Sequence, residues 1–589
     1  MRTIHMNMIK TLASHIKEYK KPSIITPILM IGEVLMETII PLLMASIVNE
    51  GINKGNTTHV FVTGIIMVVM ALCSLAFGVG GAKYGSIAAM GFGKNLKKAM
   101  FENIQTFSFA NIDKFSTSSL ITRITTDVGN IQMSYMMLLR ICMRAPASLI
   151  CAMAMSFFIS PKLATVYLVA VIILGFALVI IASKAMKYFQ ESFKKYDKLN
   201  ESVQENVSAI RVVKAFVRGD YEKGRFHKAA QDIYDTFVKA ENIVIWNNPL
   251  MQFTVYSCIL LISWFGAQFI VAGDLETGDL MALLTYCMNI LMNLMMLAMI
   301  FVMSSMSVAS GQRICEVLEE KATITNPENP VMEVADGSIC FENVTFRYSE
   351  HSEAPVLDNI NLEIQSGQTI GIIGGTGSSK STLVNMISRL YDVNEGVVYV
   401  GGKDVREYDL ETLRNEVAVV LQQNVLFSGS ILDNLRWGNA EATEEECIEA
   451  CKMACADEFI ETFPDKYNTH IEQGGTNVSG GQKQRLCIAR ALLKKPKVLI
   501  LDDSTSAVDT ATDAKIRAAF KTAIPGTTKL IIAQRISSVQ EADKIIVLND
   551  GKVDGFGTHE ELLETNAIYR DVYEAQVNGS GDFDEGGDN

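Results

Sequence analysis

The first half of the chain is dominated by long apolar stretches, whereas the second half alternates short apolar runs with polar ones. A helix needs about 20 mainly apolar residues to cross the hydrocarbon core of a bilayer. Stretches of this kind lie at about residues 23–49, 58–82, 135–159, 163–183, 250–272 and 281–308. The last three contain no charged residue, which is unusual for a helix of a soluble domain. The pattern therefore predicts an all-α transmembrane domain with six helices within residues 1–318.

Basic residues mark one side of these predicted spans. Lysines and arginines concentrate before the first span and in the long connections after the second and fourth spans. The turn between spans five and six instead carries Asp274, Glu276 and Asp279. Because basic loops stay on the cytoplasmic side, we expect a multi-pass protein of the cell membrane with both termini in the cytoplasm. The two long basic connections have a helical pattern, so we expect the spans to continue as helices into the cytosol.

Two pairs of charges interrupt the apolar spans. Glu33 and Glu37 are four residues apart in the first span, and Arg140 and Arg144 have the same spacing in the third. Residues four apart share one helix face. We favour a structural pairing of acids with arginines; substrate binding, or charges that reach the interface from the span ends, are the alternatives. A methionine stripe in span six could line an adaptable cavity or serve packing alone: Met292, Met295, Met296, Met299, Met303 and Met306.

Composition narrows the possible partners. Hydrophobic residues make up 49% of the chain and charged residues 20%, so an apolar part is joined to an ordinary soluble part. The net charge of −13 argues against a nucleic-acid partner, which needs a basic surface. The 11 cysteines lack the paired spacing of a zinc site and are expected to be free thiols.

The second half has the pattern of an α/β domain. Residues 319–336 are polar, contain Pro327 and Pro330, and are expected to form a linker. From residue 337 to 576, strand-like runs such as residues 339–348 and 368–374 alternate with helices, which predicts a mostly parallel sheet. Residues 577–589 are acidic and rich in Gly and Asp, so we expect a disordered tail.

A phosphate-binding motif follows the second of these strands: Gly374-Gly375-Thr376-Gly377-Ser378-Ser379-Lys380-Ser381, with a helix beginning near Thr382. Strand, glycine-rich loop and helix are the context that a P-loop requires. Backbone N–H groups of such a loop surround phosphate oxygens, and the helix N-terminus adds a favourable dipole. We expect Lys380 to reach the β- and γ-phosphates and the Ser381 hydroxyl to bind Mg²⁺. Ser379 occupies a position where the pattern expects glycine, which we expect to weaken binding without abolishing it.

A second motif completes the metal site. Lys497-Val498-Leu499-Ile500-Leu501-Asp502 is an apolar strand that ends in a carboxylate, as P-loop enzymes use to hold Mg²⁺. ATP and Mg²⁺ are therefore the expected cofactors.

Between these motifs lies Val478-Ser479-Gly480-Gly481-Gln482, and here the chain resembles the ATP-binding cassette (ABC) transporters, whose signature reads LSGGQ. The resemblance covers nearly the whole chain and implies the type I ABC exporter fold. It identifies Tyr348 as the aromatic that stacks on adenine, and Gln422 as the Q-loop glutamine that contacts Mg²⁺ and the reacting water. It also identifies Ser506-Ala507-Val508-Asp509 as the D-loop. Residues 115–123 and 207–216 resemble regions at the two cytoplasmic coupling segments.

The resemblance further implies a dimer in which two cassettes enclose two ATP molecules. Each ATP then contacts the P-loop of one chain and Ser479, Gly480, Gly481 and Gln482 of the other. Two catalytic positions depart from the family pattern. Asp503 stands where the family has a glutamate that polarises the attacking water, and its side chain is one methylene shorter, which breaks the reach of a general base. Gln534 stands at the switch histidine, and glutamine has no cationic form.

Together these departures predict a site that binds ATP but hydrolyses it slowly. We therefore expect a heterodimer in which a second ABC half-transporter chain supplies the competent catalytic residues and this chain lends its signature. Export of small hydrophobic or amphipathic molecules of the multidrug type is the expected function. A lipid flippase, a peptide exporter, and an ATP-gated channel or regulator on the same scaffold remain alternatives. Neither a peptidase domain nor a large external loop is apparent, which favours small substrates.

Overall fold

The structure is a computed structural model and describes residues 2–349, 354–504 and 507–577. Contacts divide the chain into two compact units. The helical unit comprises Met1–Gln105 and Ser116–Glu320, and the α/β unit comprises Thr106–Phe115 and Lys321–Asn589. Ser506 of the expected D-loop and the expected tail from Asn578 onward lie outside the described residues.

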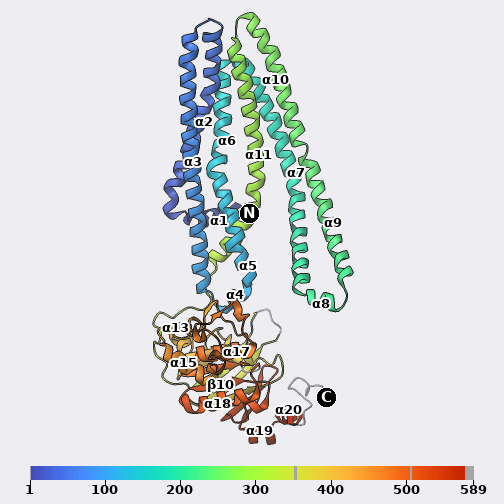
Figure 1. Cartoon of the computed structure of the whole chain (residues 1–589). Coiled ribbons are helices and arrows are strands. Elements are labelled where there is room, and N and C mark those ends of the chain that lie inside the picture. The colour runs from blue at the N-terminus through green and yellow to red at the C-terminus, as the bar shows by residue number, and fades with distance from the viewer. Residues whose placement is uncertain (1, 350–353, 505–506, 578–589) are drawn as a thin grey trace. The chain divides into compact units, whose positions relative to one another are not determined.

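The helical unit consists of long helices joined by short turns (Figure 1). Its helices are α1 (Arg2–Ser14), α2 (Lys20–Ser46), α3 (Thr57–Thr106), α5 (Thr117–Thr122), α6 (Val128–Ile159), α7 (Pro161–Ser208), α8 (Ile210–Ala215), α9 (Gly219–Val244), α10 (Asn247–Ala272) and α11 (Thr277–Glu319). Among the described residues, six helical segments are long and apolar enough to span a membrane: Lys17–Ile52, Thr57–Thr106, Thr117–Ile159, Pro161–Ser208, Gly219–Ala272 and Thr277–Leu297. The prediction of six apolar helices is confirmed.

Several of these helices are much longer than a bilayer requires. α3 has 50 residues and α7 has 48. At a rise of about 1.5 Å per residue such helices extend about 70–75 Å, whereas a bilayer core is about 30 Å thick. α7 and α9 run side by side, joined by α8 (Figure 1), and Phe189 and Phe237 pack edge to face between them with ring centroids 5.6 Å apart. The long connections are therefore helical, as the sequence predicts.

Buried tyrosines fasten α11 to its neighbours. Tyr286 on α11 donates a hydrogen bond to the carbonyl oxygen of Thr38 on α2 at 2.6 Å. Tyr167 on α7 donates to the carbonyl oxygen of Leu283 on α11 at 2.8 Å. Both rings are fully buried, so each hydroxyl needs such a partner to offset the loss of water.

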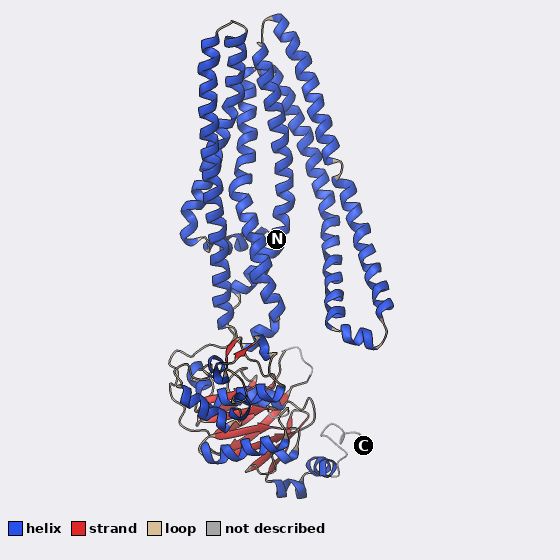
Figure 2. Ribbon diagram, viewed as in Figure 1, coloured by secondary structure: helices blue, strands red, loops and turns tan. Residues whose placement is uncertain are grey.

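The α/β unit contains two main sheets, whose strands are red in Figure 2. The larger has the strand order β12-β11-β3-β10-β9-β6, in which only the β11–β12 pair is antiparallel. Its strands are β3 (Thr369–Ile373), β6 (Val417–Val420), β9 (Val498–Asp502), β10 (Thr528–Ile532), β11 (Lys544–Asn549) and β12 (Lys552–Gly557). Strands β3, β9 and β10 are almost entirely buried and consist of apolar runs, as expected for strands covered on both faces.

The second sheet is antiparallel, with the order β2-β1-β4-β5. It comprises β1 (Ile339–Phe346), β2 (Leu357–Ile364), β4 (Glu395–Val400) and β5 (Lys403–Asp404), and a short pair joins β7 (Gly429–Ser430) to β8 (His470–Ile471). The described helices are α4 (Phe109–Phe115), α12 (Lys380–Ile387), α13 (Leu410–Glu416), α14 (Ile431–Leu435), α15 (Glu444–Met453), α16 (Asp457–Ile460), α17 (Gly480–Leu492), α18 (Thr510–Ala523), α19 (His559–Thr565) and α20 (Ala567–Val577). The α/β fold is confirmed, although β1 lies in the antiparallel sheet rather than in the parallel one.

The segment expected to be a linker is attached to the α/β unit. The backbone of Val331 is hydrogen-bonded to Glu407 at 2.8 Å and to Asp409 at 3.0 Å, and Asn326 accepts a hydrogen bond from the Leu410 amide. α4 also belongs to this unit, although its sequence lies between two membrane helices.

Candidate functional site

The glycine-rich loop, Asp502, Asp503 and Gln534 lie where three parallel strands end. β10 lies between β3 and β9, and Ile532 of β10 pairs with Ile372 and with Asp502. The glycine-rich loop follows β3, Asp503 follows β9, and Gln534 follows β10. Carboxyl ends of parallel strands meet at one edge of a sheet, which is where α/β folds bind ligands. The sheet therefore brings together residues that are up to about 160 positions apart in sequence.

The glycine-rich loop has the form of a phosphate cradle. Lys380 begins α12, and its Nζ donates to the carbonyl oxygens of Gly374 and Gly375 at 2.6 and 2.8 Å. A Cβ atom on Gly374 would lie 2.5 Å from Ser378 Oγ, so only glycine fits there. Gly377 has φ +84° and open space around it, which leaves room beside the loop. The loop, the lysine and the helix N-terminus fit a nucleotide phosphate.

Ser379 carries the backbone strain that its sequence position implies. It precedes α12 with φ +74° and ψ +23°, in the left-handed region. A side chain in this region crowds the backbone, whereas glycine adopts it freely. This left-handed conformation explains why the motif has glycine at the position of Ser379.

Ser381 and Asp502 form an oxygen pair beside the loop. The Ser381 hydroxyl donates to Oδ1 of Asp502 at 3.0 Å. Asp502 is buried, and this burial raises the pKa of its carboxyl, although the hydrogen bond from Ser381 and the charge of Lys380 lower it in part. Hydroxyl and carboxylate oxygens are the ligands that Mg²⁺ takes in proteins together with phosphates, so the donor set fits the metal.

The two residues that depart from the expected catalytic pattern touch each other. Nε2 of Gln534 donates to Oδ2 of Asp503 at 3.2 Å. The Asp503 amide also donates to the carbonyl oxygen of Ile532 at 3.2 Å, which ties the end of β9 to the end of β10. Asp503 has φ +47°, a left-handed conformation that aspartate tolerates better than most residues.

An aromatic cluster lies beside the same loop. Tyr348 is 52% exposed, and its ring packs edge to face on Phe346 and on Tyr391, with centroids 4.9 and 5.2 Å away. Its hydroxyl shares a hydrogen bond with Thr382 of α12 at 3.0 Å. The remaining exposed ring surface suits stacking by a flat base.

The Ser479–Gln482 motif forms the N-terminus of α17. Ser479 accepts a hydrogen bond from the Gln482 amide at 3.3 Å, and the Gln482 side chain accepts one from the Ser479 amide at 2.9 Å. This capping box leaves Gly480 exposed at the positive end of a 13-residue helix. Gly481 faces Ala507, whose amide donates to Gln484 at 3.0 Å.

Comparison with known proteins decides the family. Residues 23–309 match the model of the ABC transporter transmembrane region, and residues 357–506 match the ABC transporter model. The uncharacterized ABC transporter ATP-binding protein YfiB of Bacillus subtilis is 37% identical over 568 residues, which cover 96% of this chain and 98% of that protein. A similarly described protein of Mycobacterium tuberculosis is 35% identical over 574 residues, covering 97% and 98%. The chain belongs to the ABC transporter family.

A solved structure described as a bacterial Atm1-family ABC exporter with ATP bound matches this ABC transporter with a TM-score of 0.81 at 23% identity, over 95% of this chain and 98% of that one. This likeness confirms the ABC exporter fold. The chain is thus a multi-pass membrane protein with an ABC ATPase domain, and that domain implies ATP binding.

Gln422 is not in contact with the predicted metal ligands of this ABC transporter. It is exposed in the loop after β6, and within the described residues no hydrogen bond joins its side chain to Ser381 or Asp502. Its role at the metal stays a prediction.

The sequence did not single out Tyr391, which connects the aromatic cluster to α4. The Tyr391 hydroxyl donates to Oδ2 of Asp113 at 2.7 Å, and its ring packs against Phe109 with centroids 6.0 Å apart. Burial and the Asp113 carboxylate both raise the pKa of Tyr391. No local motif marks this tyrosine, since its partners come from a segment nearly 280 residues earlier.

The charged residues of the spans form the acid–arginine pair expected from their spacing. Arg144 on α6 donates to both carboxylate oxygens of Glu37 on α2 at 2.8 and 2.9 Å, and Glu33 lies 3.7 Å from the same guanidinium. Arg140 packs across Gly85 of α3, where a Cβ atom would lie 3.1 Å from the arginine Cδ. These contacts join the first three spans.

Proposed function

We propose that this chain is one subunit of an ATP-driven exporter that binds ATP at its own P-loop, hydrolyses it slowly there, and supplies its signature to a competent site on a second ABC chain. The contact between Asp503 and Gln534 carries this proposal. The shorter carboxylate is engaged by an amide, and no cationic side chain replaces the histidine expected at the switch position. A general base needs to be within about 2.6–3.2 Å of the proton that it removes, so the pair favours nucleotide retention over turnover.

The residues have distinct proposed tasks. Lys380 and the loop amides bind the phosphates, Tyr348 stacks on the adenine, and Ser381 and Asp502 hold Mg²⁺, with Gln422 joining the metal when the site closes. Mg²⁺, once bound between these residues and the phosphates, would neutralise negative charge on the nucleotide. Ser479 and the N-terminus of α17 face the ATP of the partner chain, where a helix dipole attracts phosphate.

The exposed apolar tip of the α7–α9 hairpin favours an interaction with a second chain. Val212, Phe216 and Val217 at the α7–α9 end are 56%, 73% and 87% exposed, although this end lies far beyond the bilayer length of α7. Clustered apolar side chains in water indicate a protein interaction surface. We propose a heterodimer, because a homodimer would contain two slow sites. Both termini and the ATPase domain lie in the cytoplasm in this proposal, on the side of the basic loops.

A cavity in the helical unit favours an apolar transported molecule. It lies between α7 and α11, has a volume of about 440 Å³, and is lined by Gly175, Leu178, Val179, Ala182, Ser183, Leu294 and Leu297. That volume is within the range of small-molecule sites, and Ser183 alone among these residues has a polar side chain. We propose small hydrophobic or amphipathic molecules as cargo, moved outward by alternating access.

The decisive experiment compares nucleotide binding with turnover. The full-length chain, purified alone in nanodiscs, is expected to bind ATP in a Lys380-dependent manner and to release phosphate far more slowly than the same chain copurified with its native ABC partner. A Lys380→Ala variant provides the binding control. Rapid turnover by the unpartnered chain would falsify the slow-site assignment.

A transport assay separates a pump from a channel. Inside-out vesicles that contain both chains should accumulate a hydrophobic dye against its gradient only with ATP and Mg²⁺. Dye equilibration without accumulation would instead indicate an ATP-gated channel. Lipid movement between leaflets, measured with a labelled phospholipid, tests the flippase alternative in the same vesicles.

A further inference from the structure

The last helix among the described residues reaches the nucleotide site. Gln576, near the C-terminus of α20, contacts the switch segment, defined here as residues 534–538. Its Nε2 donates to the carbonyl oxygen of Gln534 at 3.0 Å, and its Oε1 accepts from the Ile536 amide at 2.9 Å. One carboxamide therefore spans the backbone on both sides of Arg535.

α20 provides a rigid support for this carboxamide. Tyr569 and Val572 are buried, and Gln576 follows them at positions i+7 and i+4. Such spacing places all three on one face of the helix. The start of α20 is fastened to α19 by the hydrogen bond between Tyr569 and His559 at 2.7 Å. Because the apolar face of α20 packs into the core, Gln576 is directed at the switch segment.

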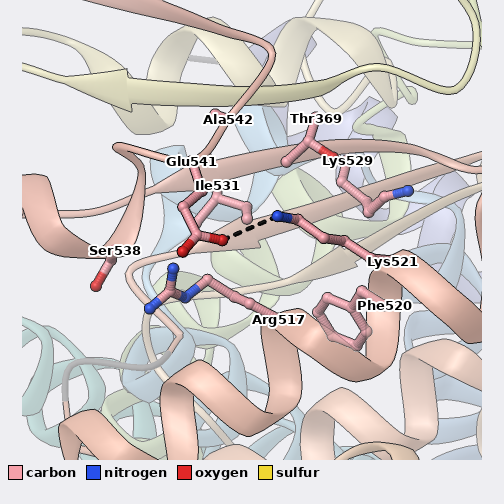
Figure 3. Close-up of a pocket in the computed structure, with 9 residues that line it drawn as sticks. All are labelled: Thr369, Arg517, Phe520, Lys521, Lys529, Ile531, Ser538, Glu541 and Ala542. Atoms are coloured by element: carbon pink, nitrogen blue, oxygen red, sulfur yellow. Dashed lines mark hydrogen bonds and ion pairs between the residues drawn. The ribbon is translucent and has the colours of Figure 1, made fainter. Parts of the chain in front are cut away.

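The opposite side of the switch segment rests on α18. The Ser538 hydroxyl donates to Oδ2 of Asp513 at 3.2 Å, and Arg517 donates to the same oxygen at 3.2 Å. Figure 3 shows Arg517 and Ser538 at the edge of a pocket, with Lys521 paired to Glu541 at 2.9 Å. This pocket measures about 30 Å³, enough for about one water molecule, so it is a packed support rather than a ligand site.

Gln534 is thus held at three points. Its side chain contacts Asp503, its carbonyl oxygen contacts Gln576, and the following residues rest on α18. A side chain that must meet a phosphate needs its backbone fixed to within about 0.5 Å. Asp503 follows β9 and α18 supports the switch segment, whereas Gln576 comes from the last described turn of the chain.

We propose that Gln576 is a positioning residue of the nucleotide site: it fixes the Gln534 backbone so that the Gln534 amide reaches the γ-phosphate of ATP. The inference rests on the proposed function of this site. It makes α20 part of the machinery that distinguishes ATP from ADP. ADP has no γ-phosphate, so its binding does not depend on Gln576.

The test measures the affinities of the full-length chain in nanodiscs for fluorescent ATP and ADP analogues. Gln576→Ala should lower the ratio of ATP affinity to ADP affinity about three- to tenfold, the effect of about one hydrogen bond. ADP affinity should stay within about twofold of the wild-type value. Gln534→Ala should have the same effect, and the double variant should add nothing to it.

Two further variants separate positioning from simple support of α20. Glu574→Ala alters an exposed residue of the same helix and should leave both affinities unchanged. Gln576→Glu keeps an acceptor for Ile536 but loses the donor to Gln534, so it should lower the ATP-to-ADP ratio as Gln576→Ala does.

The inference is overturned if Gln576→Ala keeps the wild-type ratio, or if it weakens ATP and ADP binding alike. If the wild-type chain still binds ATP in a Lys380-dependent manner, either of these results leaves the proposed function intact. A wild-type chain without Lys380-dependent ATP binding would overturn both.

Discussion

Gln534 donates a hydrogen bond from Nε2 to Oδ2 of Asp503 across 3.2 Å. Both residues replace those that the ABC family resemblance leads one to expect, and the hydrogen bond joins the two side chains directly. The two positions should therefore be altered together to change the chemistry of the site.

The first prediction concerns restored hydrolysis. The double variant Asp503→Glu, Gln534→His should raise phosphate release by the unpartnered chain about ten- to a hundredfold, within the range that a positioned base contributes. Each single variant should give less, because each leaves one part of the pair mismatched. A phosphate-release assay checks this, with Asp502→Asn added to the double variant as an inactive control. Unchanged turnover of the double variant would show that Asp503 and Gln534 are not the cause of slow hydrolysis.

The second prediction concerns strain before α12. Ser379→Gly should raise the free energy of unfolding of the α/β unit by about 0.5–1 kcal/mol, since it removes a side chain from a left-handed position. Gly377→Ala is the matched opposite change: Gly377 has φ +84° with open space around it, so a methyl group adds strain without a clash. Thermal unfolding of both variants should shift in opposite directions. A drop in melting temperature for Ser379→Gly would contradict the strain argument.

The third prediction concerns the charges within the spans. Glu37→Gln removes the carboxylate that lies 2.8 Å from Arg144, whereas Glu33→Gln removes one at 3.7 Å. Because the Arg144 and Glu37 side chains are 39% and 42% exposed, the loss is discounted from that of a fully buried pair to about 1–2 kcal/mol. Glu37→Gln should therefore lower the melting temperature in detergent more than Glu33→Gln. Equal effects would mean that the ion-pair distance does not govern stability here.

The fourth prediction concerns α4. Tyr391→Phe retains the ring contacts with Phe109 and Tyr348 but loses the hydroxyl that donates to Asp113. Amide hydrogen exchange in residues 106–115 should become about three- to tenfold faster, as expected for one lost hydrogen bond. Asp113→Asn retains an acceptor oxygen and should cause a smaller change. Identical exchange in Tyr391→Phe and wild type would show that the ring contacts alone hold α4.

The sequence predicted those features that depend on local pattern. The number of spans followed from the apolar stretches, and the glycine-rich loop followed from its strand–loop–helix context. Asp502 was predicted to hold Mg²⁺ because it ends an apolar strand, as the corresponding carboxylate does in P-loop enzymes. In each case a short range of sequence contains the physical determinant.

Features that depend on distant contacts were not predicted. Residues 339–346 have the apolar pattern of a strand, but the pattern does not tell that β1 pairs with β2 and β4 in an antiparallel sheet. Gln576 lies 42 residues after Gln534 on a helix with no motif, and Tyr391 meets Asp113 across 278 residues. Such pairings are selected by tertiary packing, so local propensity carries no signal for them.

The placement of α4 also bears on how this protein can be dissected. Residues 106–115 are covalently part of the membrane-spanning portion, yet they complete the packing of the α/β unit through Phe109 and Asp113. A recombinant fragment that starts at Lys321 would expose the Tyr391 surface to solvent. Measurements on such a fragment would describe an ATPase domain that lacks α4. A tethered or added peptide with the α4 sequence would be needed to restore the contact.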